Sequence, residues 1–237
     1  MKVPAFFTRP ALDAFRGLEV VLAKGDGRSL VLVFLGLLVG YWIYVPIHEL
    51  AHAFACLATG GRVTRLEIDP LYGADLLAGV FPWVVSGSEY AGRLSGFDTG
   101  GSDLVYLATD LGPFLFTVFP AIVWLRWAAR RERAMLFGAA LPWALAPFMS
   151  LTGDAYEIGS ILVTELPPWS EPTLQTLLRG DDLGKKVSEL LASPTPAWGG
   201  LGLATLLGAL WAFGTYALGG WVAGKLHQPP VVAPTRN

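Results

Sequence analysis

An apolar run from Leu30 to Thr59 contains the sequence His48-Glu49-Leu50-Ala51-His52 and limits the folds that this chain can adopt. An α-helix over this run exceeds the roughly 20 residues that cross a bilayer, so the sequence predicts a transmembrane helix. His48, Glu49 and His52 are the only ionisable side chains of the run besides tyrosines and Cys56. Polar or charged groups at membrane depth cost about 2–3 kcal/mol each without partners. The cluster is therefore expected to have a ligand or partner.

The spacing of the two histidines points to a metal ion. In a helix, His48 and His52 lie one turn apart on one face. Two imidazoles at that spacing can hold one zinc ion, and Glu49 can reach a water bound to it. Zinc lowers the pKa of such a water, and a glutamate can take its proton as hydroxide attacks a carbonyl. The alternative is a chance occurrence of the motif, which its position inside an apolar helix disfavours.

The composition is that of a membrane protein. The 237 residues are 53% hydrophobic and 15% charged, with a mean hydropathy of +0.50. A single cysteine excludes an internal disulfide framework and a cysteine-based zinc cage. With a net charge of −2 and no basic patch among aromatic residues, we expect no nucleic-acid partner.

Three further apolar segments are long enough to span a bilayer: Leu104–Trp127, Ala134–Leu166 and Trp198–Ala223. The second of them, Ala134–Leu166, is expected to be broken near Ser150-Leu151-Thr152-Gly153. We therefore expect an all-α membrane protein with about four transmembrane helices and a short β-hairpin or re-entrant segment after the first. The expected organisation is an N-terminal amphipathic segment (1–29), a metal-binding transmembrane core (30–166), an external loop (167–197), and a fourth transmembrane helix with a tail (198–237).

The basic residues predict the orientation of these helices. If the N-terminus is cytoplasmic, eleven of the 17 Lys and Arg residues fall on that side and six on the other. This distribution favours two cytoplasmic termini and places the His48–His52 motif toward the outer half of the membrane.

Asp154 is the expected third metal ligand. The first and third apolar segments run the same way, and His48 lies 18 residues past Leu30 while Asp154 lies 20 residues past Ala134. At about 1.5 Å per residue, the two side chains share a depth. In the alternative interpretation, Asp154 and Thr152 only cap a helix N-terminus.

Two other acids fall in the same layer. Asp110 and Glu157 could each hydrogen-bond a histidine ligand or replace Asp154 as a ligand. Cys56 could also ligate zinc, although a lone buried cysteine is more often a small apolar residue.

The segments outside the four spans have weaker signals. Leu12, Phe15, Leu18 and Leu22 recur at helical spacing, which predicts an amphipathic helix over Ala11–Ala23, on the membrane surface or as a solvated leader. Arg62–Asp69 predicts a short edge strand, which could pair with a substrate segment or belong to a hairpin capping the bundle. We expect a re-entrant or interfacial segment at Gly73–Gly87, which is apolar but too short to span a bilayer. We expect an external loop with a short helix over Leu183–Leu191 in the polar stretch Glu171–Pro196.

The motif in its setting resembles a known family. His48-Glu49-Leu50-Ala51-His52 in a membrane helix, then Gly60-Gly61-Arg62-Val63, then an aspartate on a later helix, resemble the site-2 protease family of intramembrane zinc metallopeptidases. The likeness covers Leu30 to Leu166 and is strongest to the compact bacterial branch without a PDZ domain. Ser150–Ala155 stands where the family usually has Asn-Pro…Leu-Asp-Gly, and family members usually keep the site nearer the cytoplasm.

The resemblance implies zinc bound by His48, His52 and Asp154, with Glu49 as general base. It implies a multi-pass protein of the bacterial inner (plasma) membrane that hydrolyses a peptide bond of a transmembrane or membrane-adjacent protein substrate. The rival interpretation is a non-catalytic scaffold or assembly factor with a structural or vestigial metal site. A third interpretation is a heme-binding or transport subunit that uses His48 and His52, although histidines one turn apart suit a single zinc ion better than axial heme ligation. The sequence leaves the substrate, cleavage site, pathway and oligomeric state open.

Overall fold

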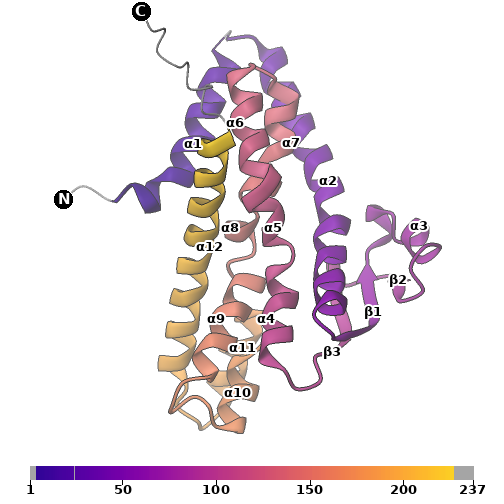
Figure 1. Ribbon diagram of the computed structural model, residues 1–237, viewed down its shortest axis with the longest axis vertical. Helices are drawn as coiled ribbons and strands as arrows, with labels where there is room; N and C mark the ends of the chain where they lie inside the picture. Colours follow the sequence, from indigo (N-terminus) through magenta and orange to yellow (C-terminus); the bar gives the residue numbers. More distant parts are fainter. Residues whose placement is uncertain (1–3, 24, 227–237) are drawn as a thin grey trace, which may run out of the picture.

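The computed structural model describes residues 4–23 and 25–226, which form a mostly helical chain with one small sheet at its side (Figure 1). The helices are α1 (Ala5–Leu22), α2 (Gly27–Ala58), η1 (Pro70–Tyr72), α3 (Ala74–Ala78), α4 (Asp103–Leu111), α5 (Phe114–Phe116), η2 (Thr117–Ala121), α6 (Ile122–Arg130), α7 (Ala134–Ala144), α8 (Ala146–Met149), α9 (Asp154–Thr164), α10 (Pro172–Leu178), α11 (Leu183–Ala192) and α12 (Trp198–Leu226). The strands are β1 (Arg62–Ile68), β2 (Val84–Ser86) and β3 (Gly92–Asp98).

Within the described residues, two helices, α2 and α12, are long and apolar enough to cross a membrane. A third span arises if α4 and the helical segment Phe114–Arg130, which meet at 46°, are counted as one. The bend falls at Gly112-Pro113, where proline interrupts helical hydrogen bonding. The expectation of a largely helical membrane protein is confirmed at this level.

The predicted third span, Ala134–Leu166, is not one helix. It is divided into α7, α8 and α9, with non-helical backbone at Ser150–Gly153, where the sequence predicts a break. A four-span arrangement therefore stays a prediction.

Glycines bring the long helices into backbone contact. A Cβ atom on Gly138 of α7 would lie 2.0 Å from the carbonyl oxygen of Val33 on α2, and one on Gly159 of α9 would lie 2.0 Å from that of Ala204 on α12. Small residues allow this approach in membrane bundles, and packing then sets the helix spacing. In this way α2, which carries the histidines, is fixed relative to the α7–α9 segment, which carries Asp154.

The sheet has the strand order β2-β1-β3, with β1 parallel to β2 and antiparallel to β3. The prediction of an edge strand at Arg62–Asp69 is wrong, because β1 is the central strand. The sequence of β3, Gly-Arg-Leu-Ser-Gly-Phe-Asp, lacks the regular alternation by which strands are recognised, so its pairing with β1 was not expected. β3 is instead the edge strand on the side of the histidines.

The Gly73–Gly87 segment folds back onto β1 as α3 and β2. Leu76 and Val80 remain exposed (77% and 64%), while Phe81 stacks on Trp83. Whether this segment enters the bilayer stays a prediction.

The polar stretch after α9 is folded against the bundle. It contains α11 at the predicted place and an additional short helix, α10. Arg179, between them, donates to both carboxylate oxygens of Asp103 at the start of α4 (2.5 and 3.0 Å). The Leu183 N–H donates to the Thr152 carbonyl (2.9 Å), which holds the α10–α11 turn next to the start of α9.

The N-terminal helix α1 begins at Ala5, six residues before the predicted Ala11. Its Asp13 accepts hydrogen bonds from Arg126 of α6 (2.6 Å) and from the Tyr216 hydroxyl of α12 (3.1 Å), which ties α1 to the bundle. Its position relative to a membrane surface stays a prediction. The end of the predicted C-terminal tail, from Gln228 on, lies outside the described residues.

Candidate metal centre

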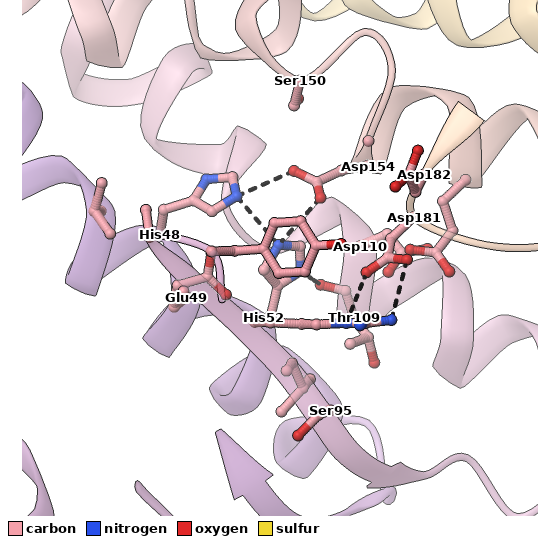
Figure 2. A pocket seen from close by; sticks show the side chains of 18 of the residues that line it. His48, Glu49, His52, Ser95, Thr109, Asp110, Ser150, Asp154, Asp181 and Asp182 are labelled. Carbon is pink, nitrogen blue, oxygen red and sulfur yellow. Dashed lines mark hydrogen bonds and ion pairs between the residues drawn. The ribbon is translucent and has the colours of Figure 1, made fainter. Parts of the chain in front are cut away.

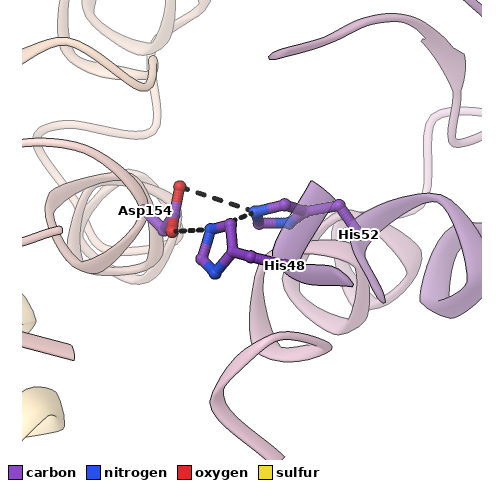
Figure 3. A group of neighbouring side chains, drawn as sticks. All are labelled: His48, His52 and Asp154. Carbon is purple, nitrogen blue, oxygen red and sulfur yellow. Dashed lines mark hydrogen bonds and ion pairs between the residues drawn. The ribbon is translucent and has the colours of Figure 1, made fainter. Parts of the chain in front are cut away.

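Two histidines of α2 turn their rings to the same side (Figure 3). His48 and His52 are one helical turn apart, and their Nε2 atoms lie 3.2 Å from each other. Both residues are buried, with 8% and 7% of their surfaces exposed. Their spacing along α2 therefore presents a pair of ring nitrogens to one point in the protein.

Asp154 faces this pair from the opposite side. Its Oδ2 atom lies 3.0 Å from Nε2 of His48, and its Oδ1 atom lies 3.6 Å from Nε2 of His52. Asp154 is the first residue of α9, and the N-cap residue is Gly153, which makes no side-chain cap. The alternative in which Asp154 and Thr152 only form a helix cap is therefore not what the structure contains. The carboxylate is directed at the histidines.

The remaining ring nitrogens have partners of their own. Nδ1 of His52 lies 2.9 Å from the carbonyl oxygen of Thr109, and Nδ1 of His48 lies 2.6 Å from the hydroxyl of Tyr44. A carbonyl oxygen can only accept, so Nδ1 of His52 carries the hydrogen, and Nε2 of the neutral ring presents a lone pair toward Asp154. In known metal sites, contacts of this kind at the second ring nitrogen orient the histidine ligands.

The donor set fits a divalent cation. His48, His52 and Asp154 each offer one ligand atom, and these atoms lie within 4.8 Å of one another. Oδ2 of Asp154 is buried without a hydrogen-bond partner among the described residues. An unprotonated imidazole nitrogen and a carboxylate oxygen that face each other at this distance repel unless a proton or a cation lies between them. The three side chains could hold a metal ion.

Glu49 lies beside this group, against β3. A Cβ atom on Gly92 would lie 2.4 Å from Cγ of Glu49, so only glycine allows the strand to pass this close. Gly92 has no signal in the sequence, because its role depends on β3 reaching α2.

The group opens into a cavity of about 840 Å³ between α2, β3, α4, α9 and the α10–α11 turn (Figure 2). Asp110 and Glu157 line the same cavity but do not belong to the metal-binding group. The Tyr106 hydroxyl donates to the Glu157 carboxylate, so Glu157 is engaged with α4. Tyr44 and Thr109 are the partners of the histidine Nδ1 atoms, a role that the sequence left open to Asp110 and Glu157.

Some site residues had a sequence signal and others did not. Tyr44 precedes His48 by four residues, and this spacing on a helix could have indicated contact. Thr109 acts through its backbone carbonyl, which no side-chain pattern reveals. Cys56 is fully buried beside Gly61 and is not part of the metal-binding group.

Comparisons of this chain with protein-family models, with curated proteins and with solved structures give no match. The chemistry of the site therefore rests on its own geometry.

The Tyr44 contact gives a first testable prediction. Tyr44→Phe removes the hydroxyl beside Nδ1 of His48 and leaves the aromatic ring, so the fold should persist while His48 loses its orienting partner. We expect zinc affinity to fall by about 10- to 100-fold, the usual effect of removing such a partner. Competition with a fluorescent zinc chelator measures this change. Tyr41→Phe, one turn earlier on the same helix, is the matched control, and equal affinities of the two variants would contradict the assignment.

Proposed function

We propose that this chain is an intramembrane zinc metalloprotease that hydrolyses a peptide bond of a membrane-embedded or membrane-adjacent protein. The observation that carries the proposal is the convergence of His48, His52 and Asp154 at a cavity whose wall includes Glu49. The family resemblance of the motif points the same way.

Zinc is the metal that this donor set suits best. Two imidazole nitrogens and one carboxylate are a common ligand set of catalytic zinc, whereas structural zinc usually has four protein ligands. Among the described residues, three side chains form the group, and it borders a cavity. This favours an enzyme over a scaffold with a closed structural site. A bound zinc ion would supply Lewis-acid activation of water and of the scissile carbonyl.

In the proposed reaction Glu49 moves the proton. Its carboxylate accepts a proton from the attacking water and returns it to the nitrogen of the leaving amine, so that one peptide bond and one water give a carboxylate and an amine. Its contact with Gly92 limits the positions that the side chain can take. His48, His52 and Asp154 hold the metal, and Tyr44 and Thr109 keep the rings oriented.

The edge of β3 is the proposed place for the substrate backbone. β3 is one of the two outer strands of the sheet, and its residues Gly92, Leu94 and Ser95 line the cavity. An extended segment can add to such an edge through main-chain hydrogen bonds, which would position its peptide bond next to Glu49. In this proposal β3 takes the role that the sequence suggested for the Arg62–Asp69 strand.

The proposed setting is a bacterial inner membrane. We infer four spans, formed by α2, by α4 to α6, by α7 to α9 and by α12, with both termini cytoplasmic because most Lys and Arg residues then lie inside. The substrate is a transmembrane or membrane-adjacent protein.

Metal analysis and metal removal test this proposal. Purified protein should contain about one zinc per chain, and a chelator should stop cleavage of synthetic transmembrane peptides in liposomes. Activity should return when zinc is added back, while magnesium, which prefers oxygen ligands, should not restore it. Peptide cleavage that persists after complete removal of the metal would overturn the proposal.

A further inference from the structure

A second pair of acids lines the cavity beyond the metal-binding group. Asp110 on α4 and Glu157 on α9 are both buried, with 3% and 8% of their surfaces exposed. Glu157 follows Asp154 by three residues, which places the two on one face of α9 with Cβ atoms about 5–6 Å apart. Asp110 follows Thr109, whose carbonyl lies next to His52. The acid pair therefore adjoins the metal-binding group.

The protein supplies few donors to this pair. The Tyr106 hydroxyl donates to the Glu157 carboxylate, whereas Oδ2 of Asp110 is buried and has no hydrogen-bond partner among the described residues. Buried polar groups are nearly always hydrogen-bonded, and a buried carboxylate without a partner is costly. The Asp110 oxygen lacks a cationic or hydrogen-bonding partner.

The cavity as a whole is lined by more acidic than basic side chains. Arg93 is the one Lys or Arg among the described residues that line it, and its Nε atom is paired with Asp181 at 3.2 Å. Asp154 is engaged with the histidines. No protein cation in the described lining is left for Asp110 and Glu157, so a cation that enters the cavity would meet them without a competitor.

We propose that Asp110 and Glu157 form a subsite for the ammonium or guanidinium group of a lysine or arginine side chain of the substrate. This inference rests on the proposed function, since it places a basic residue near the bond that is cleaved. A hard inorganic cation such as Ca²⁺ needs six to eight oxygen ligands, whereas an ammonium group is satisfied by about three acceptors. In the described part of the chain, the one set of three side chains that could bind a metal ion is His48, His52 and Asp154. Asp110 and Glu157 are not in that set, so they suit an organic cation better than a metal ion.

The subsite also explains how a charged side chain could be accepted at membrane depth. A lysine that enters the cavity loses hydration, and paired carboxylates offset this loss. Removal of the charge from the substrate then leaves the two acids unpaired, which is how buried polar sites reject analogues that lack the polar group.

A binding experiment tests the subsite without any need for catalysis. Zinc-loaded full-length protein in nanodiscs is titrated with n-hexylammonium or with 1-hexanol, a neutral analogue of equal length, and binding is followed by ligand-observed NMR. We expect Asp110→Asn to weaken n-hexylammonium binding by about tenfold or more and to leave 1-hexanol unchanged. Asp75→Asn, at an exposed acid of α3 outside the cavity, is the matched control and should bind like the wild type.

Two outcomes of this titration would contradict the proposed subsite. Equal binding of n-hexylammonium to Asp110→Asn and to wild type, or its displacement by equimolar sodium or calcium chloride, would overturn the subsite. Asp110→Asn removes a buried charge and is expected to unfold at the same or a higher temperature than the wild type. Glu157→Gln provides the same binding test on the other acid should Asp110→Asn fail to fold.

A cleavage experiment separates this inference from the proposed function. Synthetic transmembrane peptides carry either lysine or norleucine, moved one position at a time through their central part. The lysine peptide should be cleaved on the order of ten- to a hundredfold faster at one position, and Asp110→Asn should remove that preference. Equal cleavage of both peptides at every position would overturn the subsite and leave the protease proposal intact. Binding of n-hexylammonium through Asp110, together with no cleavage of any peptide, would support the subsite and overturn the protease proposal.

Discussion

Glu49→Gln is expected to abolish peptide hydrolysis while the protein keeps its zinc. Glutamine has nearly the size of glutamate, so the contact with Gly92 and the packing of β3 should be preserved. It cannot accept a proton, and the loss of a general base lowers rates by about 10²- to 10⁴-fold. Cleavage of a synthetic transmembrane peptide in liposomes gives the rate, and elemental analysis of the same preparation gives the zinc content.

The control for this variant is Glu89→Gln, an exposed glutamate between β2 and β3 that does not line the cavity. It should cleave at the wild-type rate. Two results would contradict the assigned role: cleavage by Glu49→Gln at the wild-type rate, or loss of zinc from this variant. The first would place the proton transfer on another group, and the second would make Glu49 a part of the metal site.

The metal-binding group could be anticipated because its parts have local signals. The pairing of His48 with His52 follows from helical periodicity alone, and their position inside an apolar helix makes an unpaired role unfavourable. The nearness of Asp154 followed from counting residues along two parallel helices. The prediction succeeds although the second of these segments is divided into α7, α8 and α9, and glycines such as Gly36 and Gly138 hold α2 and α7 in backbone contact.

The sheet and the walls of the cavity could not be anticipated in the same way. Strand order depends on contacts between distant segments, and β3 contains two glycines that weaken any strand signal. β1 was therefore expected at the edge, although it lies in the centre. The roles of Gly92 and of the Asp110–Glu157 pair also depend on contacts between β3, α4 and α9. No local pattern in the sequence indicates that these elements lie together.

The division of the third apolar segment shows a further limit of composition. Ala134–Leu166 is apolar enough for one long helix, but the helix is interrupted at Leu145, two residues before Pro147, and again at Ser150–Gly153, and the chain forms α7, α8 and α9. Hydropathy reports the cost of placing a segment in lipid and not its backbone geometry. The interruption matters for the site, because it is what brings Asp154 to the start of a helix that faces the histidines.

Asp154→Ala is expected to remove bound zinc and with it all peptide cleavage. His48 and His52 alone would leave two protein ligands, whereas zinc sites have three or four, so the affinity should fall by more than the roughly 100-fold seen when only a partner of a ligand is lost. The apoprotein should still fold, because Asp154 makes no helix cap and the ion pairs of its carboxylate are with the two histidines of the site and not with residues of the core. Zinc content by elemental analysis and the unfolding temperature in detergent measure the two effects.

Glu157→Gln is the matched control, since Glu157 lies one turn later on the same face of α9 and is an acid that the sequence offered as an alternative ligand. It should keep its zinc, because its carboxylate is engaged with Tyr106 and lies outside the metal-binding group. If Glu157→Gln lost zinc while Asp154→Ala retained it, Glu157 would be the ligand, and α9 would have to turn relative to α2 when metal binds. If both variants retained zinc, the metal would be held without α9, and the convergence of His48, His52 and Asp154 would not be the basis of catalysis.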